Sequence, residues 1–249
     1  MCGLFGVVSP ATWQECSAFL DLMKVSSLRG PHSTGLLVSR RNKTFVYREA
    51  VNSVTFVESP EMADVLNPTR MYGDIYMGHC RYATVGKVTK SNAHPFRAGS
   101  IVAAHNGTLG SYKDKLEGKA DITDSQVLIE EMASNGIIPT LSQLTSKDSY
   151  AVSIYDLRTK SLMLSRNHQR PLYLAVCDDT GTVFYSSEGG MLRFVLSRSN
   201  IDARILVVRP FVLISIDPRD IKPGNKEPWS AVEISEPKVE DNVSDKSPF

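Results

Sequence analysis

The chain has 249 residues and a formal net charge of +1 at pH 7, with 42% hydrophobic and 22% charged residues. These are the values of a globular protein that is long enough for one large domain with a buried core. The balanced charge, with lysines and arginines scattered along the chain, excludes a general attraction to nucleic acid or to an anionic membrane surface. The longest apolar stretch runs from Ile205 to Ile216, is interrupted by Arg209 and Pro210, and is too short to cross a membrane.

Cysteine usage points to a reducing compartment. The four cysteines, Cys2, Cys16, Cys80 and Cys177, show no close pairing, which is typical of free thiols, and neither a charged leader nor an apolar run precedes Cys2. We therefore expect a cytoplasmic protein. Cysteines and histidines show no Cys-x-x-Cys or His-x-x-x-His spacing, so we expect neither a metal nor another cofactor.

The first half of the chain is predicted to alternate strands with capped helices. Residues 3–8 form a buried strand, and Thr12 with Glu15 makes a capping box that starts a helix ending before Gly30. A second capped helix covers residues 123–135. The remaining predicted elements of this half are strands at residues 36–38, 44–47, 74–77 and 100–104 and a helix at 138–145.

The second half is predicted to consist mainly of short strands separated by turns. The expected strands cover residues 150–155, 161–164, 172–176, 183–186, 206–208 and 212–216, with a short helix at 189–196. This mixture predicts an α+β fold. Because the composition turns polar after Pro218, we expect one domain over residues 1–235 and a flexible polar tail over 236–249.

Cys2 is the most informative residue of the chain. Small residues at positions 2 and 3 permit removal of Met1, which would leave a thiol and a free α-amine on Cys2. Their ordinary pKa values, ~8.5 and ~7.7–8.0, allow proton exchange near neutral pH, so nucleophile and general base would share one residue. The alternative is an ordinary buried cysteine on a first strand, and residues 1–6 alone leave both open.

Further segments accompany this N-terminus in a fixed order. They read Arg-Gly-Pro-His-Ser-Thr-Gly at 29–35, Gly-His-Cys-Arg-Tyr-Ala-Thr at 78–84, Ser-Asn-Ala-His-Pro-Phe at 91–96, His-Asn-Gly-Thr at 105–108 and Ile-Thr-Asp-Ser-Gln-Val at 122–127. With Cys-Gly-Leu-Phe-Gly at 2–6, they resemble the class II glutamine amidotransferase domain of the glucosamine-6-phosphate synthase and amidophosphoribosyltransferase families. The resemblance covers residues 2–196. It implies a four-layer αββα sandwich of two mainly antiparallel sheets, the N-terminal nucleophile hydrolase fold.

The resemblance also implies roles for individual residues. Arg81, whose planar guanidinium matches a carboxylate, would bind the α-carboxylate of glutamine, and Asp124 would bind its α-amine. The alternatives are a surface arginine and an aspartate that complements a helix dipole. Thr84, Arg29 and His94 are also expected at the substrate site. Gly78 and Gly86 flank residues 81–84 and are expected to let them move as a lid.

Asn106 and Gly107 are expected to stabilise an oxyanion. An amide side chain and a glycine N–H provide two neutral donors at one point, as an oxyanion hole requires. Asn-Gly is also a common hairpin turn, and we expect it where a strand gives way to a turn. His105 is expected to orient its neighbours rather than to act as an acid or base.

Taken together, the motifs predict a stand-alone glutaminase. Cys2 would attack the side-chain amide of L-glutamine and release ammonia to a separate acceptor synthase, because only a few dozen residues follow the family-like region. Two alternatives stay open: an amidase acting on another γ-glutamyl amide, and a non-catalytic assembly or regulatory protein that retains the fold. Retention of Met1 would favour the last, because it blocks the Cys2 amine. Self-association into a homo-oligomer is also left open.

Overall fold

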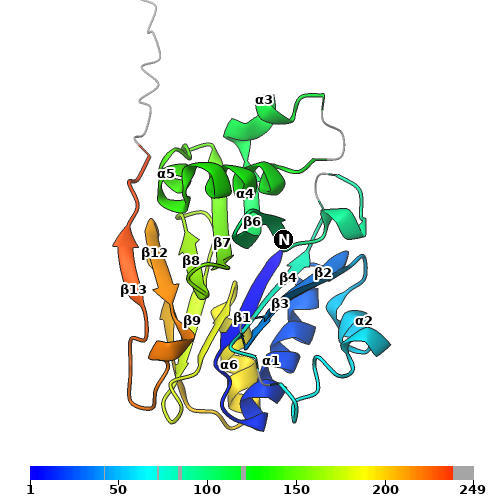
Figure 1. The fold of residues 1–249 in the computed structure, drawn as a ribbon, viewed down its shortest axis with the longest axis vertical. Coiled ribbons are helices and arrows are strands. Elements are labelled where there is room, and N and C mark those ends of the chain that lie inside the picture. Colours follow the sequence, from blue (N-terminus) through cyan, green and yellow to red (C-terminus); the bar gives the residue numbers. More distant parts are fainter. Residues whose placement is uncertain (42, 72, 84–85, 119–121, 238–249) are drawn as a thin grey trace, which may run out of the picture.

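A computed structural model gives the structure of the protein, and residues 1–41, 43–71, 73–83, 86–118 and 122–237 are described. Two antiparallel sheets form its centre (Figure 1). Within the described ranges, none of the helices has the length and apolar character of a membrane span.

The first sheet carries the N-terminal strand near its middle. Its seven strands, in spatial order, are β11 (Ala203–Val207), β9 (Tyr173–Cys177), β10 (Val183–Ser186), β1 (Gly3–Val8), β4 (Ile75–Arg81), β2 (Ser33–Arg40) and β3 (Lys43–Glu49). Because β1 pairs with β10 on one side and β4 on the other, it is buried along its whole length.

The second sheet packs against the first. Its six strands, in spatial order, are β13 (Ser230–Glu233), β12 (Val212–Ile216), β8 (Ser161–Arg166), β7 (Asp148–Asp156), β6 (Ile101–Leu109) and β5 (Phe96–Ala98). Leu4 and Met77 of the first sheet pack with Val102 and Tyr155 of the second in the central apolar core.

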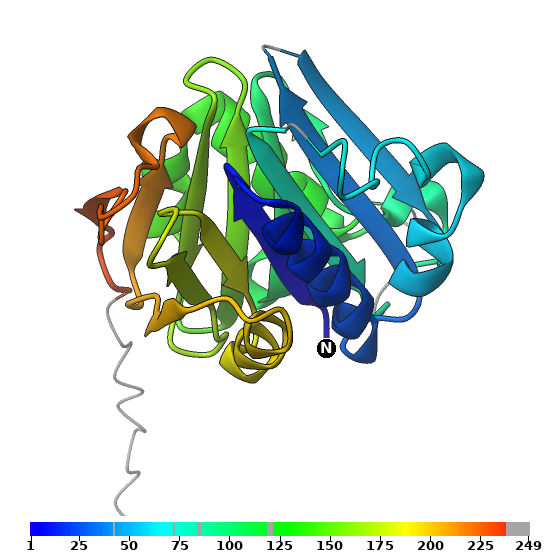
Figure 2. The ribbon, with the colours of Figure 1, turned by 90° about the horizontal axis from the view of Figure 1, so that it is seen from below.

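Helices cover the outer face of each sheet (Figures 1 and 2). Phe19 and Leu192 belong to the core between the first sheet and its helices, and Leu128 to the core beneath the second sheet. The first sheet is covered by α1 (Trp13–Val25), α2 (Ser53–Val57) and α6 (Gly189–Arg198), and the second by α4 (Asp124–Asn135) and α5 (Ile137–Ser142), whereas the short helix α3 (Lys113–Leu116) buries none of its residues and lies beyond the end of the sheet (Figure 1). Single turns of 3-10 helix lie at Ser26–Leu28, Pro60–Met62, Lys90–Asn92, Gly110–Tyr112 and Pro218–Asp220. The architecture is the expected four-layer αββα sandwich.

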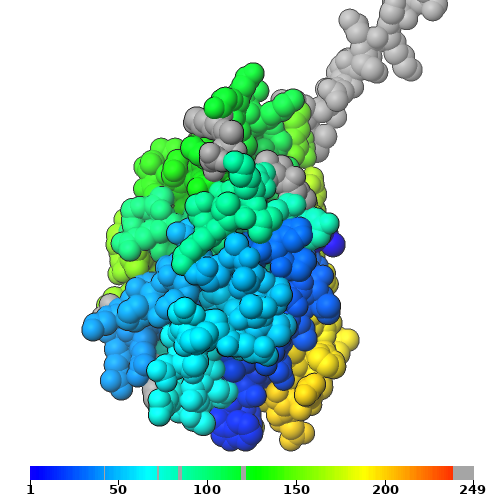
Figure 3. All heavy atoms as spheres, turned by 90° about the vertical axis from the view of Figure 1, so that its right-hand side faces the viewer, coloured from blue at the N-terminus to red at the C-terminus, as the bar shows by residue number. Residues whose placement is uncertain are grey.

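The segment from β3 through α2 forms the surface on one side of the molecule (Figure 3). Figure 3 shows this segment, coloured from mid-blue to cyan, covering much of that face. Because β3 is an edge strand with one unpaired side, it is largely exposed, and Phe45 keeps 44% of its surface accessible.

Most predicted elements are present, and the capping boxes at the starts of α1 and α4 are both formed as expected. The short strand β5, the helices α2 and α3 and the strand β13 were not predicted. The tail predicted for 236–249 lies outside the described residues except for Glu236 and Pro237.

Two local predictions are wrong. Asn106 and Gly107 do not form a turn: they lie within β6, where they pair with Ala151 and Tyr150 of β7. Gly78 is no hinge, because it lies inside β4 and a Cβ there would come within 2.2 Å of the Phe5 ring. Glycine at position 78 is needed for close packing.

Candidate active site

Cys2 lies at the point where β1 begins, beside the end of β4. The β1–β4 ladder pairs Gly3 with Cys80, so the residue before β1 meets the chain leaving β4. In Figure 1 the N-terminus lies between β4 and β6, one strand from each sheet. Residues of both sheets can therefore reach Cys2.

The thiol of Cys2 contacts the backbone of Tyr82. Tyr82 N–H donates to Sγ at 3.2 Å, and Sγ lies 3.6 Å from the Tyr82 carbonyl oxygen. Burial raises the pKa of the Cys2 thiol above its ordinary value, while the Tyr82 amide, the N-terminal charge, Arg81 and Arg29 act in the opposite direction. Because the raised pKa keeps the thiol protonated near neutral pH, a base is needed to form the thiolate.

The amide of Asn106 connects the two sheets beside Cys2. Its Nδ2 donates to the Cys2 carbonyl oxygen at 3.0 Å and to Ser187 Oγ at 2.8 Å. Its Oδ1 lies 3.0 Å from His79 Nε2. Burial lowers the pKa of His79 to about 3, so His79 is neutral and its Nε2–H donates to Oδ1. This bond fixes which way the Asn106 amide faces.

Gly107 follows in β6 at a position that requires glycine. A Cβ would lie 1.8 Å from the Ser149 carbonyl oxygen and 2.6 Å from His105 Nε2. His105 joins three elements, since its Nδ1 lies 2.9 Å from Ser125 Oγ at the start of α4 and its Nε2 lies 3.3 Å from Ser149 O on β7. Burial lowers the pKa of His105, so it is a neutral, orienting residue.

Arg29 holds the backbone of Cys2. Its Nε donates to the Cys2 carbonyl oxygen at 2.8 Å, and its guanidinium forms an ion pair with Glu188. The side chain of Met1 lies against it, with Sδ 3.8 Å from Arg29 Nη2 and 3.9 Å from Arg170 Nη1. The structure therefore brings Arg29 to Cys2 as expected from the motif.

Arg81 ends β4 and is 5% exposed. Its Nη1 donates to the Lys87 carbonyl oxygen at 3.0 Å. Burial lowers the pKa of its guanidinium, while the ionised form of Cys2 and the Asp124 carboxylate act against that effect. Arg81 is a buried cation beside the thiol, which rules out the alternative of an ordinary surface arginine.

Asp124 is the first residue of α4, and its carboxylate bonds the backbone. Oδ2 accepts from Leu109 N at 2.9 Å, and Oδ1 accepts from Ser125 N at 2.8 Å. The carboxylate thus supports the helix start, as the alternative interpretation expects. It also lines a cavity of about 610 Å³ with Thr108 and Lys113, and Cys2, Arg81 and Asn106 are not among the described residues that line this cavity.

The structure does not place the other two predicted substrate-binding residues, Thr84 and His94, beside Cys2. Thr84 lies outside the described residues. His94 is 4% exposed and packs its ring 4.2 Å from that of His79 and 4.5 Å from that of Phe96, measured between centroids. His94 therefore contacts His79, the residue that bonds Asn106, and none of its described ring contacts involves Cys2. Its role in substrate binding stays a prediction.

Sequence reasoning gave His79 no role, although a signal was present. Side chains alternate along a strand, so His79 faces the same side of β4 as Arg81. Ser187 also proves close to the site, where it accepts from Leu4 N at 2.9 Å and contacts Asn106. Arg170, whose Nε donates to Ser149 Oγ at 3.2 Å, carries no pattern that would have revealed it.

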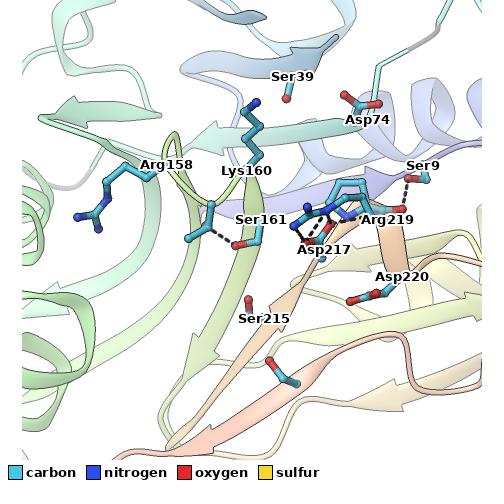
Figure 4. Close-up of a pocket in the computed structure, with 13 residues that line it drawn as sticks. Ser9, Ser39, Asp74, Arg158, Lys160, Ser161, Ser215, Asp217, Arg219 and Asp220 are labelled. Atoms are coloured by element: carbon cyan, nitrogen blue, oxygen red, sulfur yellow. Dashed lines mark hydrogen bonds and ion pairs between the residues drawn. The ribbon is translucent and has the colours of Figure 1, made fainter. Parts of the chain in front are cut away.

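A larger cavity of about 810 Å³ lies at the opposite end of β1 (Figure 4). Serine hydroxyls such as Ser9 and Ser39 line it, with charged side chains that include an ion pair of Arg219 and Asp217. Ser9 is separated from Cys2 by all of β1, roughly 20 Å at the rise of a strand. None of the predicted site residues is among the described residues that line it.

Comparison with known proteins identifies similar chains. A family model described as "Glutamine amidotransferases class-II" matches residues 1–141. A glutamine–fructose-6-phosphate aminotransferase (isomerizing) of Gluconobacter oxydans is 26% identical over 202 residues, 76% of this chain and 32% of that protein. The enzyme of the same name from Sulfolobus acidocaldarius is 34% identical over 151 residues, 55% of this chain and 24% of that protein. The chain therefore spans less than half the length of these relatives.

A solved structure shares the fold. The glutamine phosphoribosylpyrophosphate amidotransferase from B. subtilis, complexed with ADP and GMP, matches with a TM-score of 0.68 at 20% identity. The match covers 94% of this chain and 49% of that one. It supports the N-terminal nucleophile hydrolase architecture of the two packed sheets.

The raised pKa of Cys2 predicts how its reactivity depends on pH. Only the thiolate reacts with iodoacetamide, so the rate of Cys2 alkylation should be low near pH 7 and rise roughly tenfold per unit to beyond pH ~8.5. Mass spectrometry of the chain that retains Met1 measures the rate. Cys2→Ala is the control, because Cys16, Cys80 and Cys177 are buried. A rate that levels off below pH ~8 would contradict the prediction.

Proposed function

The chain belongs to the class-II glutamine amidotransferases, and we propose that Cys2, freed by removal of Met1, is the nucleophile of its glutaminase reaction. The observation that carries the proposal is the position of Cys2: the Asn106 amide binds its backbone carbonyl, and its thiol lies at the Tyr82 N–H within the influence of the buried cation of Arg81. The site needs no metal in this proposal, and within the described residues no group of His, Cys, Asp or Glu could hold one.

The first half of the reaction forms a thioester. The α-amine of Cys2 takes the thiol proton, and Sγ attacks the side-chain carbonyl carbon of glutamine, whose oxygen becomes an oxyanion. When the tetrahedral species collapses, the C–N bond breaks and the α-ammonium returns its proton to the leaving nitrogen. Ammonia and a γ-glutamyl thioester on Cys2 result. The α-amine then activates a water that attacks the thioester, and glutamate leaves.

Asn106 and Gly107 are the proposed donors to the oxyanion. The Nδ2 of Asn106 already bonds the Cys2 carbonyl and Ser187, so it must exchange the bond to Ser187 Oγ for one to the substrate. Ser187 can release it, because its hydroxyl keeps the bond from Leu4 N. His79 prevents the amide from turning its oxygen toward the developing negative charge.

We propose that Arg81 and Asp124 select the α-amino acid end of glutamine. Their charges are opposite and close enough to influence each other, which matches the carboxylate and ammonium of a zwitterion. Arg29 keeps Cys2 in place through its backbone carbonyl and does not need to contact substrate. His94 supports His79 from behind.

We further propose that the ammonia is consumed by a separate acceptor synthase. The relatives named above are about three to four times the matched length, and their names include fructose 6-phosphate beside glutamine.

Replacing the nucleophile tests the central proposal. Cys2→Ala should abolish release of glutamate and ammonia from L-glutamine while the melting temperature stays close to that of wild type, and Cys2→Ser should keep traces. Cys16→Ala, which removes a buried thiol on α1, is the matched control and should stay active. Turnover by Cys2→Ala at the wild-type rate would refute the mechanism.

Charge removal tests the selectivity residues. Arg81→Met and Asp124→Asn should each lower kcat/KM for glutamine by ~30- to 5,000-fold, since each leaves a substrate charge unpaired. Asp114→Asn, an exposed aspartate lining the same cavity as Asp124, is the matched control. Equal turnover of glutamine and of its analogue without the α-amine would exclude Asp124 as the amine-binding residue.

The acceptor proposal predicts a dependence on a partner. The isolated chain should release glutamate slowly, and a synthase captured with the tagged chain and identified by mass spectrometry should accelerate release, by up to about a hundredfold if the competent state is ~1% populated alone. Family-like activity of the chain alone would indicate an independent amidase instead.

A further inference from the structure

The two residues that follow β4, Tyr82 and Ala83, direct their backbone N–H groups to opposite sides, one toward the β1 side and one toward the β2 side. The β2–β4 ladder ends at the pair Ser33–Arg81, and the β1–β4 ladder ends at Gly3–Cys80. Beyond these pairs, no strand residue among those that the structure describes is paired with Tyr82 or Ala83. Unpaired backbone N–H groups are costly, so the two donors need other partners.

Side chains from the two flanking elements complete the ladders. On the β1 side, Tyr82 N–H donates to Cys2 Sγ at 3.2 Å. On the β2 side, Ala83 N–H donates to His32 Nδ1 at 2.9 Å. The thiol and the imidazole therefore hold adjacent peptide groups of the same segment from opposite edges.

His32 holds this segment by more than one contact. Its backbone N–H donates to the Arg81 carbonyl oxygen at 3.1 Å, and its ring lies 4.9 Å from that of Tyr82. The approach is close because of Gly30, where a Cβ would lie 2.3 Å from the Cys80 carbonyl oxygen. The loop before β2 is thus pressed against the end of β4.

We propose that His32 is a positioning residue for the nucleophile: by accepting the Ala83 N–H, it keeps the Tyr82 N–H directed at Cys2 Sγ. An N–H aimed at sulfur stabilises the thiolate more than the thiol, so losing its alignment should make Cys2 less reactive. The hydrogen bond between Ala83 N–H and His32 also holds the backbone two residues after Arg81 in place. The consequence for turnover rests on the proposed glutaminase function, whereas the consequence for thiol reactivity does not.

Two substitutions of His32 distinguish the effect of its hydrogen-bond acceptor, Nδ1, from the effect of its ring packing on Tyr82. His32→Phe keeps a ring against Tyr82 but removes the acceptor. His32→Asn loses the ring, but its Oδ1 is the same number of bonds from the backbone as Nδ1 of histidine and can accept the Ala83 N–H. The melting temperature of each variant establishes that it is folded.

The measurements are the rate of Cys2 alkylation by iodoacetamide near pH ~7.5 and, separately, kcat and KM for glutamine. Loss of one hydrogen bond corresponds to a factor of about 3 to 10, so His32→Phe should alkylate and turn over that much more slowly. His32→Asn should stay within about twofold of wild type. A purely structural role would lower the melting temperature without this difference between folded variants.

The outcomes are distinct. Wild-type alkylation by folded His32→Phe would overturn the proposal, and so would His32→Asn alkylating as slowly as His32→Phe. Slowed alkylation of His32→Phe and its recovery in His32→Asn would support it even if wild type shows no glutaminase activity. In that case the glutaminase proposal alone would fail, as it would if Cys2→Ala turned over glutamine.

Discussion

The hydrogen bonds of the Asn106 amide are the interaction on which the site depends. Asn106 belongs to the second sheet, whereas Cys2, His79 and Ser187 all belong to the first or to its immediate extensions. The interface between the sheets is otherwise packed with side chains such as Leu4 and Tyr155. One amide with both ends bonded fixes how the two sheets are placed relative to each other beside Cys2, because a buried amide left unpaired would cost about 1–3 kcal/mol.

Gly107 shows how tightly this arrangement is held. Its neighbour Ser149 lies on β7, and the approach of the Ser149 carbonyl leaves no space for a Cβ. Ser149 Oγ in turn accepts from Thr108 N at 3.0 Å and from Arg170. The backbone after Asn106 is therefore supported from β7 and from the loop after β8. A small shift of β7 would displace the Gly107 amide that the proposed oxyanion requires.

Sequence alone predicted the strands and helices that carry strong local signals, and the order of motifs led from Cys2 to Arg81, Asn106 and Asp124. It misjudged Asn106 and Gly107 as a turn, because Asn-Gly has high turn propensity and the pairing partner in β7 lies more than forty residues away in sequence. It missed β13, whose exposed residues give no hydrophobic pattern. It gave no role to His79: strand alternation places His79 on the same face as Arg81, but its partner Asn106 becomes evident only from the fold. Long-range contacts decide all three cases.

The ionisable groups around the thiol are of two kinds, histidines that are neutral and arginines that stay charged. His79, His94 and His105 are buried, and burial lowers the pKa of each, so all three are neutral near pH 7 and serve to orient amides and elements. The cations that favour a thiolate are Arg29 and Arg81, which remain charged at any physiological pH. Glu188 offsets the first of them through its ion pair. These cations do not fully offset the effect of burial on the thiol, so in the proposed reaction its activation would have to come from groups placed at the sulfur itself. In the described chain the Tyr82 amide is such a group, and under the proposed removal of Met1 the α-amine of Cys2 would be a second; both would have to be held within hydrogen-bond distance of Sγ.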